Sequence, residues 1–154
     1  MFYERLPRQA GQQARQRAGR KSGKGDAVQF KPIALWLYLL NAAVLLTHQI
    51  DAAFWHEWEL FHIPGGSQVN LLLNIPLIVL VLFGLAALAQ GRPAARFLYG
   101  LLAATGLFTA GIHSYFLLHG DAGFRLPVSL GLLAATLLLS LGQIAAWPRA
   151  SQGG

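Results

Sequence analysis

The chain has 154 residues, of which 55% are hydrophobic and only 12% are charged. Soluble domains carry about 25% charged residues, so this composition excludes an ordinary soluble domain. Cysteine is absent, which excludes disulfides, thiolate metal ligands and haem attached through Cys-x-x-Cys-His. The formal net charge of +6 does not indicate nucleic-acid binding, because most basic residues precede the first apolar segment.

Residues 1–29 are rich in Arg, Gln, Gly and Lys and show almost no apolar periodicity. This composition predicts a disordered basic tail. It lacks the apolar core of a secretory signal. We expect the tail to help determine membrane topology and to contact anionic lipid headgroups.

Four apolar segments follow, separated by turns that contain Gly or Pro. A bilayer core requires about 20 residues of helix. The first apolar run, 33–46, is shorter than this, so the first span must extend into the polar stretch that follows it. The sequence predicts an all-α transmembrane domain over residues 30–148 and a short polar tail over 149–154. The predicted spans are 33–55, 69–89, 96–118 and 127–147.

The distribution of Lys and Arg predicts the orientation of these spans. If the N-terminus is inside, all twelve Lys and Arg residues except Arg125 lie on the inner side. Because basic residues are retained in the cytoplasm, we expect both termini to be cytoplasmic. Residues 48–62 then face outward.

Each predicted span carries its polar residues along one face, at helical spacing. In lipid such faces are expected to point toward one another, which predicts a four-helix bundle with a polar interior seam. On the helical wheel of the first span, Glu57 points away from this face. The face of the first span consists of Asn41, Val44, His48, Asp51, Trp55, Glu59 and His62. The other stripes are Asn70 and Asn74; Thr105, Thr109 and His113; and Ser129, Thr136, Ser140 and Gln143.

An ionisable pair inside a membrane span is a candidate functional site, because it is costly to bury without partners. His48 and Asp51 lie near the outer end of the first span, and His113 lies near the outer end of the third. We therefore expect a polar pocket in the outer leaflet, with these three residues as candidate metal ligands. Further residues expected to line the pocket are Asn70, Asn74, Trp55 and Glu59.

Three functions fit such a pocket. In the first, the chain is a structural, binding or accessory protein whose Asp51 pairs with His48 or Arg125. In the second, the pocket binds a divalent metal such as zinc, and the protein is an enzyme acting on a lipid-like substrate. In the third, His48 and His113 ligate a b-type haem. The sequence favours the first function and favours a metal over haem, and it leaves open whether the chain is an enzyme.

Three motifs carry a family resemblance. The run His-Gln-Ile-Asp-Ala-Ala-Phe-Trp-His-Glu-Trp-Glu-Leu-Phe-His-Ile-Pro-Gly-Gly begins at His48, Asn-Leu-Leu-Leu-Asn-Ile-Pro begins at Asn70, and Phe-Arg-Leu-Pro-Val-Ser begins at Phe124. Over roughly residues 33–145 the chain resembles an uncharacterised family of small bacterial four-helix membrane proteins. This resemblance implies the architecture and a location in a bacterial inner membrane, and it brings no assigned activity.

A looser likeness is to membrane proteins with a His-x-x-Glu-Glu motif in their first span, some of which are suspected of metal dependence. In this chain Asp51 and Ala52 replace the two glutamates. One carboxylate is lost and the other is shortened.

Overall fold

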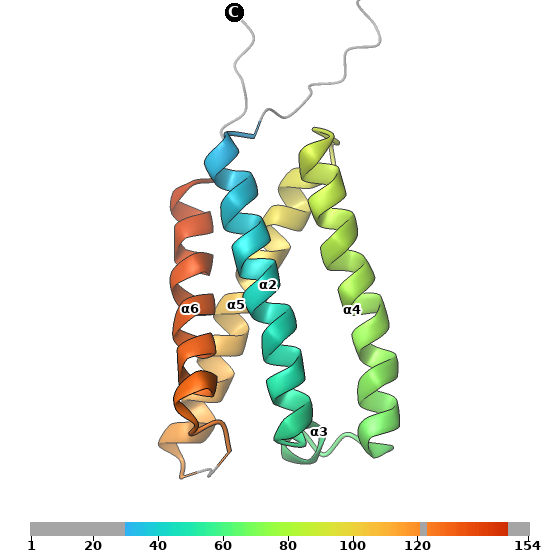
Figure 1. Ribbon diagram of the computed structural model, residues 1–154, viewed down its shortest axis with the longest axis vertical. Helices are drawn as coiled ribbons and strands as arrows, with labels where there is room; N and C mark the ends of the chain where they lie inside the picture. The colour runs from blue at the N-terminus through green and yellow to red at the C-terminus, as the bar shows by residue number, and fades with distance from the viewer. Residues whose placement is uncertain (1–29, 121–122, 148–154) are drawn as a thin grey trace, which may run out of the picture.

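The computed structural model describes residues 30–120 and 123–147, and regular structure in these ranges is entirely helical. The expected all-α fold with four long helices is confirmed (Figure 1). Successive long helices run in opposite directions, and the single turn of α3 closes one end of the bundle. The helices are α2 (Pro32–Phe54), α3 (Glu57–Leu60), α4 (Gly66–Ala89), α5 (Ala95–Leu118) and α6 (Pro127–Ala145).

Each long helix has 19 to 24 residues and is apolar enough to cross a membrane, so the protein is a multi-pass membrane protein. Pro32 and Pro127 occupy the first turns of α2 and α6, where a missing N–H is not needed by the helix. Pro76 lies inside α4, as membrane helices tolerate. The tails expected at 1–29 and 149–154 lie outside the described residues.

The long helices are not packed equally. α2, α5 and α6 contact one another extensively, whereas α4 contacts α2 and α5 and, within the described residues, does not contact α6. Every buried residue of α4 lies in its second half, away from α3. In Figure 1, α3 lies at the end of the bundle where α2 ends and α4 begins. We call this the α3 end.

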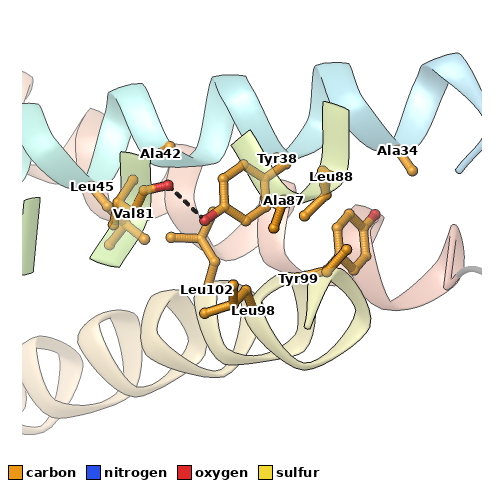
Figure 2. Close-up of a cluster of buried hydrophobic side chains, with 11 residues drawn as sticks. Ala34, Tyr38, Ala42, Leu45, Val81, Ala87, Leu88, Leu98, Tyr99 and Leu102 are labelled. Atoms are coloured by element: carbon orange, nitrogen blue, oxygen red, sulfur yellow. Dashed lines mark hydrogen bonds between the residues drawn. The ribbon is translucent and has the colours of Figure 1, made fainter. Parts of the chain in front are cut away.

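An apolar cluster holds α4 at the opposite end of the bundle (Figure 2). The Tyr38 hydroxyl of α2 donates a hydrogen bond of 3.0 Å to the backbone carbonyl of Val81 in α4. Gly84 makes room for that hydroxyl, since a Cβ there would lie 2.0 Å from it. The ring of Tyr99 stacks on Tyr38 with centroids 6.3 Å apart. The small residues that allow close approach here are Ala34, Ala42, Ala87 and Ala95.

The contact between α5 and α6 also depends on a glycine. A Cβ at Gly106 would lie 2.1 Å from Ser140 Oγ and 3.0 Å from Thr136 Oγ1. Neither hydroxyl can turn away without breaking a hydrogen bond with Asn41. Gly106→Ala should therefore lower the free energy of unfolding by about 1–3 kcal/mol through overpacking.

The matched control is Gly111→Ala, on the same helix, where a Cβ would meet no atom within 4 Å. Because alanine favours helix, this variant should be neutral or stabilising. The measurement is thermal unfolding of both variants in a mild detergent. Equal melting temperatures would contradict the close approach of α5 and α6.

Candidate metal centre

The buried polar side chains of α2 form two clusters at different depths. In the deeper cluster, Asn41 Nδ2 donates to Ser140 Oγ at 3.0 Å and to Gln143 Oε1. Asn41 Oδ1 accepts a hydrogen bond of 3.0 Å from Thr136 Oγ1. All four side chains are fully buried. The polar stripes of α2 and α6 thus meet, and this cluster joins the two helices.

The second cluster lies nearer the α3 end and is centred on two histidines. His48 Nε2 of α2 lies 3.1 Å from His113 Nε2 of α5, and the rings are almost perpendicular. The residues are 2% and 1% exposed. Among the described residues neither Nδ1 has a hydrogen-bond partner. The structure therefore brings together two of the residues that the sequence proposed as ligands.

Glu57 enters the same cluster because the chain changes direction after α2. The helix ends at Phe54, and His56 adopts the left-handed conformation, with φ 53° and ψ 46°. The turn of α3 then places Glu57 Oε1 3.3 Å from His113 Nε2, with the Glu57 side chain 19% exposed.

The prediction that Glu57 points away from the polar face is therefore wrong. That prediction assumed that the helical period of α2 continues to Glu57, whereas the helix is interrupted at His56. A left-handed conformation is uncommon for residues other than glycine. No glycine or proline marks the break at His56, so the sequence offers no signal for it.

The three groups lie close enough together to hold a metal ion. One ligand atom from each of His48, His113 and Glu57 lies within 4.8 Å of the other two. A tetrahedral zinc site with bonds of about 2.0–2.1 Å to nitrogen has ligand atoms about 3.3–3.4 Å apart. The observed separations of 3.1 Å and 3.3 Å are close to that spacing.

Phe124 covers this cluster from the connection between α5 and α6. Its ring centroid lies 4.2 Å from that of His113, 5.8 Å from that of His48 and 6.1 Å from that of Trp55. Phe124 is 3% exposed and has φ 59°. The ring shields the imidazoles, which lowers the local dielectric and strengthens electrostatic interactions there. The sequence does not indicate this role for Phe124, since an aromatic residue in a connection carries no ligating group.

Asp51, the third ligand expected from the sequence, makes a different contact. Its Oδ1 accepts a hydrogen bond of 2.8 Å from Ser129 Oγ of α6. Trp55 Nε1 in turn donates to Ser129 Oγ at 3.3 Å. Asp51 is one turn from His48 on α2, but it is not one of the three converging ligand groups. It joins α2 to α6 beside the histidines.

The remaining expected pocket residues line two separate hollows. Asn70 and Asn74 of α4 lie with Gln49 and Glu57 around a hollow of about 520 Å³ between α2, α3 and α4. The Asn74 amide donates to the Asn70 carbonyl of its own helix at 3.0 Å.

Trp55 and Glu59 lie on the other side, around a second hollow of about 520 Å³ that His56 and Phe124 also line. The Glu59 side chain is 72% exposed, and its carboxylate is 3.8 Å from His56 Nδ1. The residues that the sequence analysis assigned to a single pocket therefore line two separate hollows. The acidic group beside the histidines is Glu57 and not Glu59.

The contact between the two imidazoles predicts energetic coupling. His48→Ala and His113→Ala should be non-additive by about 0.5–3 kcal/mol, because the second substitution removes a partner already lost. The measurement is a double-mutant cycle on unfolding free energy in detergent. As a control, His48→Ala combined with Asn41→Ala should be additive, since those residues are about 10 Å apart along α2 and belong to different clusters. Additive effects in both cycles would contradict a shared environment for the two histidines.

Comparison with known proteins adds one match. The model of a family of unknown function, DUF6713, matches residues 34–150, which is more than half of the chain. No curated protein and no solved structure matches the chain.

Proposed function

We propose that this chain, which belongs to the family of unknown function DUF6713, binds a divalent transition metal between α2, α3 and α5. His48 and His113 supply imidazole nitrogens, and Glu57 supplies a carboxylate oxygen. The observation that carries this conclusion is the convergence of three electron-pair donors on one buried point.

Hydrogen bonding alone does not satisfy these groups. His113 Nε2 faces both His48 Nε2, at 3.1 Å, and Glu57 Oε1, at 3.3 Å. A neutral imidazole carries a single proton, on one of its nitrogens. One proton on His113 Nε2 can serve only one of the two contacts well, and without it the carboxylate faces a lone pair. A cation between the three groups accepts a lone pair from each of them.

The donor set favours zinc or a similar metal. Imidazole suits Zn, Cu and Ni, and two imidazoles with one carboxylate is a known zinc ligand set. Three protein ligands leave the fourth tetrahedral position for water or substrate. Glu57 also lines the hollow toward Asn74, so that position is reachable from the α4 side.

The geometry does not favour haem. In a bis-histidine haem the iron and its macrocycle lie between the two ligating nitrogens. His48 Nε2 and His113 Nε2 are 3.1 Å apart, and the Phe124 ring packs against His113. This leaves no room for a planar macrocycle between the imidazoles.

The test is elemental analysis of the purified protein, with zinc binding measured on chelator-treated protein. We expect one zinc per chain. Glu57→Gln keeps the shape of the side chain and removes its charge. Removing a group that only orients a metal ligand lowers metal affinity by about 10–100-fold. Because Glu57 is proposed as a ligand itself, Glu57→Gln should lower zinc affinity by at least as much. Affinity should also fall as the pH drops through the imidazole range, because only neutral imidazole binds metal.

The matched control is Glu59→Gln, two residues away on a side chain that is mostly exposed. It should leave zinc affinity unchanged. Equal affinities of Glu57→Gln and Glu59→Gln would overturn the ligand assignment. A purified protein that neither carries nor takes up zinc, copper or nickel would leave the cluster a structural contact between helices.

We further propose that the α3 end faces the outside of a bacterial inner membrane. The asymmetry of Lys and Arg supports this orientation. A topology reporter inserted at Gly91, between α4 and α5, should report the cytoplasm. One inserted at Gly65, between α3 and α4, should report the outside. The reverse pair of results would place the metal site on the cytoplasmic side.

A further inference from the structure

Two hollows adjoin along the side of α4 that faces the bundle. The polar hollow at the α3 end, described above, is followed by an apolar hollow of about 450 Å³ between α2, α4 and α5. Gln49 and Leu77 line both, so the two form one cleft. Other residues that line the apolar part include Tyr38, Leu45, Leu80, Leu98, Leu102 and Thr105.

The cleft exists because the buried residues of α4 all lie in its second half, away from α3. The Tyr38–Val81 hydrogen bond closes the cleft on the side away from α3. Between residues 66 and 80 no residue of α4 is buried. Asn74 and Leu77, which face the cleft, are only half-buried. The packing of the described helices therefore leaves this face of α4 available to a ligand.

The apolar part of the cleft is about as long as the hydrocarbon part of one leaflet is deep. From Gln49 to Tyr38 the cleft follows eleven residues of α2, or about 16 Å. This is about half of a 30 Å hydrocarbon core, which is the depth of one leaflet. Apart from Gln49, Thr105 and the Tyr38 hydroxyl, its lining is entirely aliphatic or aromatic.

The polar part presents hydrogen-bond acceptors. Asn74 Oδ1 is buried and has no hydrogen-bond partner among the described residues. The Glu57 carboxylate lines the same hollow, as do the side chains of Gln49 and Asn70. A buried acceptor without a donor costs about 1–3 kcal/mol, so a ligand whose head donates hydrogen bonds gains from binding here.

We propose that the cleft binds a single-chain amphiphile with a hydroxyl head, its hydrocarbon chain between α2, α4 and α5 and its hydroxyl beside Asn74 and Glu57. The inference deepens the proposed function and rests on it in one respect: the hydroxyl lies beside the fourth position of the metal. A metal there would disfavour a cationic head. The cleft itself depends only on the apolar and polar linings.

The experiment uses photolabelling of the full-length protein in detergent. The probe is hexadecanol carrying a photoactivatable diazirine in mid-chain, and labelled sites are mapped by mass spectrometry. We expect labels on the cleft side of α4 and on residues 98–102 of α5, and competition by unlabelled hexadecanol. The matching diazirine alkane, which has no hydroxyl, should label these sites no more than the exposed Val128 and Leu138 of α6.

A matched pair of variants tests the location. Leu77→Trp fills the point at which the two hollows meet, and it should reduce labelling of the cleft about tenfold, which corresponds to 1.4 kcal/mol. Val79→Trp, on an exposed position of the same helix that does not line the cleft, should leave labelling unchanged. If Leu77→Trp does not fold, Leu80→Phe narrows the apolar hollow at its edge and serves the same purpose.

Two outcomes would overturn the inference. One is equal labelling of α6 and the cleft by the hexadecanol probe, and the other is equal labelling of the two tryptophan variants. The labelling experiment is also repeated on protein that has been treated with chelator. Retained labelling of the cleft in protein without metal, together with a failed zinc analysis, would leave the amphiphile site standing while the metal proposal fails. Zinc binding without labelling of the cleft would overturn the amphiphile proposal and leave the metal proposal standing.

Discussion

A chain surrounded by lipid can satisfy its polar side chains only from within, and this constraint organises the bundle. α2 carries Asn41, His48 and Asp51 along one face, at three successive depths. Each finds a partner on another helix: Ser140 and Gln143 for Asn41, His113 for His48, and Ser129 for Asp51. Because those partners belong to α5 and α6, these two helices are drawn against α2.

α4 is held differently, and the difference creates the cleft. Its two amide side chains lie at the α3 end, and Asn74 bonds back to its own helix rather than to a neighbour. Apart from its contact with α3, it is held to the described helices by apolar packing and the Tyr38–Val81 hydrogen bond, both at the opposite end. In lipid, apolar side chains alone give little preference for a neighbouring helix over an acyl chain. The first half of α4 can therefore stand away from α2.

The two proposed functions meet at Glu57. Its carboxylate contacts His113 on one side and lines the polar hollow on the other. The Phe124 ring packs against both histidines. In this arrangement a metal with a vacant position would lie beside the head of a bound amphiphile, which is the geometry required of a metal-dependent enzyme acting on a lipid-like substrate.

The sequence by itself determined the all-α fold and the facing of polar stripes such as those of Asn41 and Ser140. These follow from the local period of a helix and from the cost of polar groups in lipid, both of which a single chain records. The same logic brought His48 and His113 to one depth. It could not assign Asp51 to Ser129 rather than to the histidines, because both partners lie within reach of the same helical face.

Only the tertiary structure decided the acidic member of the cluster and the division of the pocket. Glu57 lies beside the histidines because the chain turns at His56, which has a positive φ. This conformation is uncommon for a residue other than glycine, so the residue type does not predict it. The separation of Asn70 and Asn74 from Trp55 and Glu59 depends on how far α4 stands from α2. That distance is set by side chains more than thirty residues apart in sequence, at the Tyr38–Val81 contact, and no local pattern encodes it.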